Sequence, residues 1–184
     1  MPTNYPDDLL TRARRIKLLL TDVDGVLTEG RLFVDAHGEP LKLFNVKDGL
    51  GLFLLGEVGI RRGIITGKSS RAVERRAKEL RLDYCHQGVL DKSTVIEGLL
   101  IDAKCTLAET AYIGDDLNDL PLLTTVGLAA CPADAVEDVR ERVHLLCQQN
   151  GGRGAVRELC ELILKAQGHW ESLIERWTRG FNRK

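Results

Sequence analysis

Short apolar runs alternate along the chain with segments in which apolar residues recur three or four positions apart. A short apolar run between charged or turn residues is typical of a buried strand, and the longer period is typical of an amphipathic helix. We expect strands at 16–21, 63–66, 83–86, 111–114, 127–130 and 144–147, and helices at 48–58, 70–80, 91–103, 116–123 and 155–166. This alternation predicts an α/β fold with a central parallel sheet, doubly wound in the Rossmann-like manner.

The helix starts carry polar residues that can cap them. Asp48 is expected to cap the first helix, and Ser69 or Ser70 the second. Between the first strand and the first helix, apolar residues at 32–34 and 41–44 flank a polar stretch, which predicts a β-hairpin inserted after the first strand.

The spacing of the elements limits the number of domains. Forty-one residues separate Asp24 from Thr66 and twenty-five separate Thr66 from Lys92, and the hairpin, helices and strands fill both gaps. Neither gap has room for a cap domain. We expect one domain over 1–184, with a core at about 16–168 and a C-terminal tail at 169–184. The tail places Trp170, Leu173, Ile174 and Trp177 on one helical face, for packing on a neighbour or on its own sheet.

Composition narrows the class of protein. Hydrophobic residues make up 43% and charged residues 29% of the chain, with a formal net charge of -1, so no overall field favours nucleic acid or anionic lipid. No run approaches the ~20 apolar residues of a membrane span. The five cysteines are scattered and odd in number, which favours reduced thiols and a cytoplasmic location over disulfides or a zinc site.

Two carboxylates follow the first predicted strand. Asp22 and Asp24 lie two residues apart in an extended segment, so both approach one site, and Gly25 permits a turn directly after them. Such a pair suits phosphoryl transfer, with one carboxylate attacking phosphorus and the other serving the leaving oxygen as acid and base. The alternative is an ordinary surface turn, since Asp and Gly are turn residues.

A second acidic group follows the strand at 111–114. Asp115, Asp116 and Asp119 place three carboxylates within five residues, with no His or Cys nearby. Oxygen ligands of this kind point to Mg²⁺ as the bound ion. Helix capping by Asp116 is the alternative for part of this group.

Two further positions could hold a phosphate. Thr66 and Gly67 end the second predicted strand at a helix entry, where a hydroxyl and backbone N–H groups can bind an anion. Lys92 could neutralise a phosphate oxygen, although a lone lysine is usually a solvated surface residue.

The order of these groups resembles the four motifs of the haloacid dehalogenase superfamily, over residues 16 to 166. The resemblance implies that Asp22 is the nucleophile and Asp24 the acid/base, that Thr66 and Lys92 hold the phosphate, and that Asp115 completes a Mg²⁺ site with Asp22 and the backbone carbonyl of Asp24.

Longer phrases resemble one capless group, the 3-deoxy-D-manno-octulosonate 8-phosphate phosphatases of lipopolysaccharide synthesis. They are DVDGVLT at 22–28, FNVKDGLG at 44–51, YIGDD at 112–116 and GGRGAVRE at 151–158. The resemblance implies a homotetramer with active sites at subunit contacts. It also implies substrate contacts from Asn45, Val46, Lys47, Asp48, Gly49 and Lys68, and from Arg76 of a neighbour.

Two positions depart from that group. Lys68 stands where the family often has Arg, and Phe53 where some members have a substrate-binding Arg. Phosphatases of 9-carbon sugar acid 9-phosphates, which tend to carry an acidic residue at position 68, are the nearest alternative. A receiver-like domain or a non-catalytic phosphate-binding domain is the alternative of another class.

Overall fold

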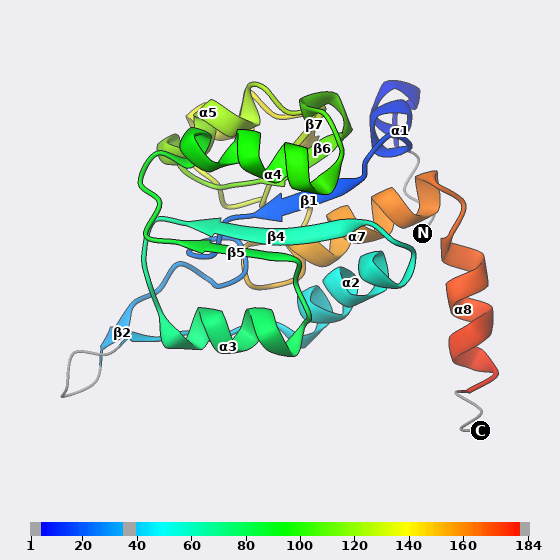
Figure 1. Cartoon of the computed structure of the whole chain (residues 1–184), viewed down its shortest axis with the longest axis horizontal. Helices are drawn as coiled ribbons and strands as arrows, with labels where there is room; N and C mark the ends of the chain where they lie inside the picture. The colour runs from blue at the N-terminus through cyan, green and yellow to red at the C-terminus, as the bar shows by residue number, and fades with distance from the viewer. Residues whose placement is uncertain (1–4, 35–39, 181–184) are drawn as a thin grey trace.

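Six strands form one all-parallel sheet in the computed structural model, which describes residues 5–34 and 40–180 (Figure 1). The chain leaves β1 toward one edge of the sheet, then returns to β6 and runs toward the other, so β1 and β6 flank a topological switch point. The strands lie in the order β5 (Tyr84–Gln87), β4 (Arg61–Thr66), β1 (Leu18–Thr21), β6 (Thr110–Ile113), β7 (Leu128–Cys131) and β8 (Leu145–Leu146).

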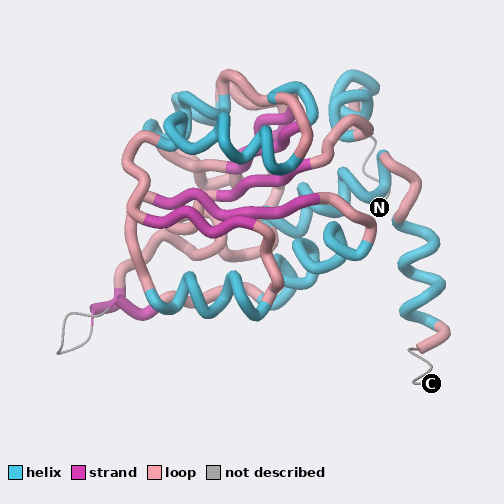
Figure 2. Tube along the Cα trace, viewed as in Figure 1, coloured by secondary structure: helices cyan, strands magenta, loops and turns pink. Residues whose placement is uncertain are grey.

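Helices cover both faces of this sheet, as the sequence pattern predicts (Figure 2). One face carries α2 (Val46–Glu57), α3 (Arg71–Glu79) and α7 (Ala155–Ala166), and the other carries α4 (Ile96–Ala103), α5 (Leu120–Leu123) and α6 (Glu137–Arg140). Side chains of β1 alternate between the two layers: Leu19 lies in the first core, Leu18 and Leu20 in the second. The strand is therefore buried on both sides, which fixes the position of the residues that follow it.

Several element boundaries differ from the prediction. Asn45, not Asp48, caps α2, because its side chain accepts a hydrogen bond from the N–H of Lys47. The predicted helix at 91–103 begins with a 3-10 turn, η1 (Lys92–Val95), and that at 116–123 begins with η3 (Leu117–Asp119). Two helices were not predicted from the sequence: α6, and α1 (Asp7–Ala13), which packs against α7.

A short hairpin stands away from the sheet. β2 (Phe33–Val34) pairs in antiparallel fashion with β3 (Pro40–Leu41), and the predicted turn at 35–39 lies outside the described residues. Figure 1 shows the hairpin on the side at which the strands of the sheet end. Within the described chain, no additional domain covers this side.

The C-terminal helix α8 (Trp170–Thr178) divides its apolar stripe between two environments. Leu173 is buried in the core, and Trp170 packs against it beneath Arg157 and Lys165. Ile174 and Trp177 stay 45% and 40% exposed. Packing on a neighbouring subunit therefore stays a prediction only for the exposed residues of the stripe, Ile174 and Trp177. In the part of the chain that the structure describes, no helix has the length and apolar character needed to cross a bilayer.

Candidate active site

The candidate residues come together at the carboxyl edge of the sheet. Asp22 directly follows β1, Thr66 ends β4, and Asp115 follows β6 after one glycine. Because β4 and β6 are the two neighbours of β1, these three positions share one edge. The backbone N–H of Asp22 donates to the carbonyl of Ile113 at 3.0 Å, which ties the first acidic loop to the end of β6.

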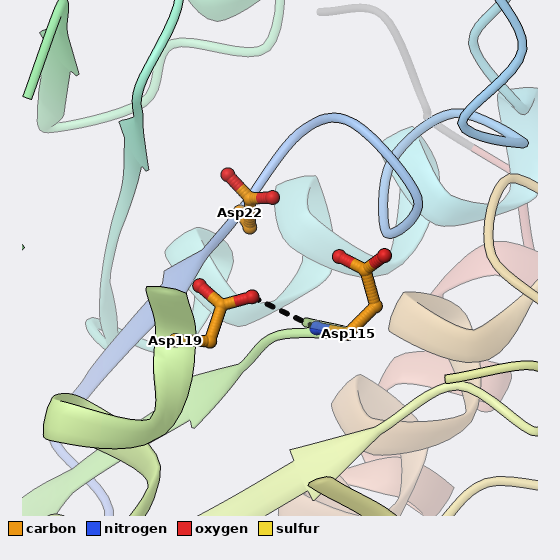
Figure 3. A group of neighbouring side chains, drawn as sticks. All are labelled: Asp22, Asp115 and Asp119. Atoms are coloured by element: carbon orange, nitrogen blue, oxygen red, sulfur yellow. Dashed lines mark hydrogen bonds between the residues drawn. The ribbon is translucent and has the colours of Figure 1, made fainter. Parts of the chain in front are cut away.

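Three carboxylates converge there, as Figure 3 shows for Asp22, Asp115 and Asp119. One oxygen of each lies within 4.8 Å of the others. Burial, followed by the negative charges of Asp22 and Asp119, raises the pKa of Asp115 to about 8. Among the described residues, Oδ1 of Asp115 is buried without a hydrogen-bond partner. Hard oxygen ligands that repel one another and leave a buried oxygen unpaired fit a divalent cation such as Mg²⁺.

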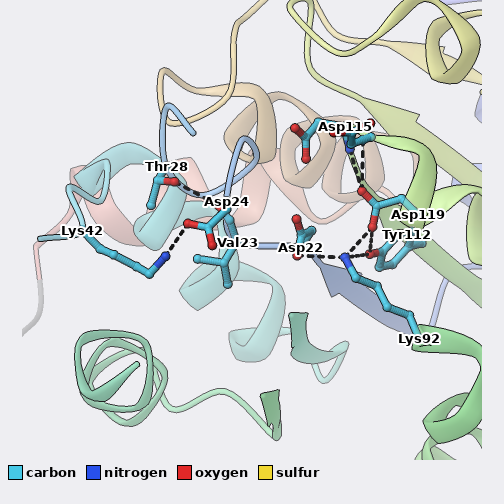
Figure 4. A network of polar contacts seen from close by, with 10 residues as sticks. Asp22, Val23, Asp24, Thr28, Lys42, Lys92, Tyr112, Asp115 and Asp119 are labelled. Carbon is cyan, nitrogen blue, oxygen red and sulfur yellow. Dashed lines mark hydrogen bonds and ion pairs between the residues drawn. The ribbon is translucent and has the colours of Figure 1, made fainter. Parts of the chain in front are cut away.

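Lys92 is fully buried among these acids, and is not the solvated surface lysine considered above. Its Nζ lies 2.8 Å from Oδ1 of Asp22 and 2.5 Å from Oδ1 of Asp119, and donates to the hydroxyl of Tyr112 at 3.0 Å (Figure 4). Although burial lowers it, the charges of Asp22 and Asp119 raise the pKa of Lys92 above its ordinary value. The ammonium group therefore faces the carboxylate expected to act as nucleophile.

Asp119 joins the loop that carries Asp115 and Asp116 to the buried pair of Lys92 and Tyr112. Its Oδ2 accepts hydrogen bonds from the N–H groups of Asp115 at 2.9 Å and Asp116 at 3.2 Å, while its Oδ1 accepts from Tyr112 at 2.5 Å. The acid cluster signalled Asp119, whereas Tyr112 stands in the phrase YIGDD at 112–116 but had no predicted role. Asp116 caps η3, the alternative considered for this residue, by accepting from the N–H of Leu117 at 2.7 Å.

The carboxylate of Asp24 lies outside this cluster and pairs with Lys42 (Figure 4). The sequence pattern predicted Asp24 beside Asp22, and Lys42 was not predicted. A signal was present in the alternation at 41–43, where a lysine stands between two leucines. The two lysines serve different acids, Lys92 facing Asp22 and Lys42 facing Asp24.

The predicted substrate segment at 45–49 forms the start of α2. Val46 and Lys47 are exposed, whereas Asp48 and Gly49 are buried. Oδ1 of Asp48 accepts from the N–H of Arg157 at 2.8 Å, so its side chain is directed toward α7. Burial raises the pKa of Asp48 to about 6. The segment thus divides into a solvent-facing part and a part held by neighbouring helices.

The remaining candidates lie around β4 and α3. Thr66 is buried at the end of β4, Gly67 follows it, and Lys68 is exposed in the turn before α3. Arg76 packs within its own chain, with its guanidinium against Gly49 and 3.0 Å from Glu79. A contact from Arg76 to a neighbouring subunit's site stays a prediction.

The family profile and the curated relatives that this chain matches belong to the same class of protein. The profile of the haloacid dehalogenase-like hydrolases matches residues 76–159. The 3-deoxy-D-manno-octulosonate 8-phosphate phosphatase KdsC of Yersinia pestis is 43% identical over 90% of this chain and 88% of its own length, and its counterpart in Escherichia coli K12 is 40% identical over 88% and 86%.

Solved structures agree with the sequence relatives. The Yersinia pestis phosphatase superposes with a TM-score of 0.88, covering 90% of this chain and 89% of its own. The Moraxella catarrhalis phosphatase, solved with a magnesium ion, a phosphate ion and a KDO molecule, is 42% identical, covers 93% of this chain and 98% of its own, and gives a TM-score of 0.90.

Proposed function

Because the chain belongs to the haloacid dehalogenase-like hydrolases, in the family of the 3-deoxy-D-manno-octulosonate 8-phosphate phosphatases, we propose that it hydrolyses that sugar acid phosphate in lipopolysaccharide synthesis. The chain is a phosphoric monoester hydrolase. The observation that carries the proposal is the 2.8 Å contact between Lys92 and Asp22 at the sheet edge beside Asp115, because it places a cation where a phosphate would meet a nucleophile.

The proposed chemistry has two steps. Asp22 attacks phosphorus, the P–O bond to the sugar breaks, and Asp24 gives its proton to the departing sugar oxygen, leaving an aspartyl-phosphate. Asp24 then takes a proton from water as the water oxygen attacks phosphorus, which releases inorganic phosphate and restores both carboxyl groups. Lys92 and the hydroxyl of Thr66 hold phosphate oxygens, together with the N–H of Gly67.

The metal site supports this chemistry. Asp22, Asp115 and the backbone carbonyl of Asp24 would hold Mg²⁺, and Asp119 lies within reach of the same position. A bound Mg²⁺ supplies the positive charge that lets a carboxylate approach a phosphate dianion. The unpaired oxygen of Asp115 supports the assignment.

Recognition of the sugar acid is proposed for Lys68, which is exposed, and for Arg76, which is partly buried within its own chain. The positive charges of Lys68 and of a neighbour's Arg76 suit a carboxylate, which simple phosphate esters lack. Asn45, Val46, Lys47, Asp48 and Gly49 would line the same side, the buried members through their backbone.

We further propose a cytoplasmic homotetramer with shared sites. Leu32, Leu41 and Leu43 of the hairpin region are 57%, 62% and 64% exposed, and strand edges and apolar side chains of this kind favour pairing between copies. Light scattering tests the mass in solution. Recovery of activity on mixing Asp22→Asn with Arg76→Ala subunits tests whether sites are shared.

A panel of sugar acid phosphates tests the substrate. The 8-carbon 8-phosphate is expected to give the highest kcat/KM with Mg²⁺, and a 9-carbon 9-phosphate a lower value. The reverse order would select the 9-carbon alternative. Asp22→Asn is expected to remove turnover while the protein stays folded, because the amide is a poor nucleophile. A tenth of wild-type activity in this variant, in round terms, would contradict the covalent mechanism.

A further inference from the structure

The chain that returns from the hairpin to α2 has an inverted pattern of burial. Leu41 and Leu43 are 62% and 64% exposed, while the side chain of Lys42 between them is 4% exposed. Alternate residues of an extended segment point to opposite sides. The hydrophobic effect alone would favour the opposite phase, with both leucines inside, and burying a charged group is costly unless it is paired. The orientation of this arm therefore depends on what Lys42 contacts.

The partner of Lys42 is the carboxylate of Asp24 (Figure 4). Within the described residues, no other acidic side chain pairs with this lysine. The end of the same arm is anchored as well: the side-chain amide of Asn45 donates to the carbonyl of Gly152 at 3.2 Å, and the N–H of Gly152 donates to the carbonyl of Val26 at 2.8 Å. The arm and the acidic loop are thus joined at two points, directly at Asp24 and, through Gly152, at Val26.

We propose that Lys42 is a positioning residue for Asp24, which it holds in place for proton transfer to the leaving sugar oxygen. This inference rests on the proposed function, in which Asp24 is the acid/base. When Asp24 gives its proton to the oxygen released from phosphorus, it becomes a carboxylate. The ammonium of Lys42 stabilises that carboxylate until the second step returns a proton from water.

The role predicts a dependence on the leaving group. A primary alkoxide is a poor leaving group and needs its proton as the P–O bond breaks, whereas p-nitrophenolate leaves readily without one. Removing a residue that assists the general acid should therefore slow the hydrolysis of alkyl esters more than that of aryl esters. Loss of a purely structural contact slows both kinds of ester to the same extent.

The test compares Lys42→Met with wild type on p-nitrophenyl phosphate and on the primary alkyl phosphate that the wild type hydrolyses fastest. We expect kcat to fall about tenfold or more on the alkyl ester and less than about threefold on the aryl ester. Lys42→Arg, which keeps the charge, is expected to recover part of the alkyl activity. Lys78→Met, which removes an exposed lysine of α3 paired with Glu74, is the matched control and should behave as wild type.

A double-variant cycle tests whether Lys42 acts through Asp24. In an Asp24→Asn background, Lys42→Met should lower alkyl ester hydrolysis by less than about twofold, because the group that it positions is gone. Melting curves of each variant show whether the fold is kept. Equal losses on both esters, or full additivity with Asp24→Asn, would overturn the inference.

Failure of the proposed function gives a different result. A wild type that prefers another alkyl phosphate overturns the proposed substrate, and Lys42 is then judged on that ester. A wild type that hydrolyses no alkyl phosphate overturns both the proposed function and the role of Lys42.

Discussion

A Cβ atom on Gly25 would lie 2.0 Å from Oδ2 of Asp115, so the turn after the first acidic pair touches the carboxylate that follows β6. Gly25 has a φ of +93°, in the region that favours glycine. On the other side of the turn, a Cβ on Gly151 would lie 1.7 Å from the carbonyl oxygen of Gly25. The turn is therefore confined between two segments that are distant in sequence.

Gly25→Ala is expected to displace Asp115 and to lower both turnover and Mg²⁺ affinity by about tenfold or more, since a one-ångström shift of a catalytic group has large effects. Steady-state kinetics and Mg²⁺ titration measure the two consequences, and thermal melting shows whether the fold is kept. Gly98→Ala in α4 is the control, because a Cβ there meets nothing within 4 Å. It should leave activity unchanged, and wild-type Mg²⁺ affinity in Gly25→Ala would contradict the expected clash.

Binding of Mg²⁺ should release protons near neutral pH. Asp115 has a pKa of about 8 and Asp22 of about 6, both raised first by burial, so the metal-free site holds protons that a cation must displace. Apparent affinity should therefore rise with pH between 6 and 8. Calorimetry in two buffers of different ionisation heat counts the protons released. An affinity independent of pH would show that Asp115 is already ionised.

Removing the buried cation should destabilise the fold as well as abolish turnover. Lys92→Met leaves Asp22 and Asp119 without their shared partner, which is expected to cost on the order of 3 kcal/mol in the free energy of unfolding. Urea unfolding in the presence of chelator measures it. Lys104→Met, at an exposed position after α4, serves as the control and should unfold as the wild type does.

Asp48→Asn should alter the pH dependence of stability. The folded-state pKa of about 6 exceeds the ordinary value of 3.8, so the folded protein binds more protons, and this contribution to stability is lost as pH rises through 6. Asn has no such titration and keeps an oxygen for the N–H of Arg157. Relative to wild type, the variant should gain roughly 2 kcal/mol between pH 4 and 7.5, measured by urea unfolding. A constant difference would contradict the shifted pKa.

Lys68→Ala should change substrate preference and leave the chemistry intact. The side chain is exposed beside Gly67, where its charge can meet the carboxylate of a sugar acid. KM for the sugar acid phosphate is expected to rise about tenfold, with little change on p-nitrophenyl phosphate. Equal losses on both substrates would place Lys68 in the phosphate-binding machinery.

The sequence predicted the parts of this molecule whose signals are local. Strand periodicity and the position of polar residues at strand ends were enough to predict that Asp22, Thr66 and Asp115 lie at one edge of the sheet. Tyr112 was not predicted, because its role depends on Lys92 and Asp119 arriving from separate segments. Lys42 was missed for a similar reason, since its burial depends on where the hairpin arm lies. Asn45 displaced Asp48 as the cap of α2 because Asp48 is held by α7.

The central position of β1 has a consequence for how activity appears as the chain folds. Asp22 acquires its partners only when β6 has docked beside β1, yet these strands are separated by the whole of β4 and β5. Pairings so distant in sequence form late, because closing the intervening loop costs conformational entropy. A refolding chain should regain its helical circular dichroism before it regains enzymatic activity. The delay between these two signals would measure how long the pairing of β1 with β6 takes.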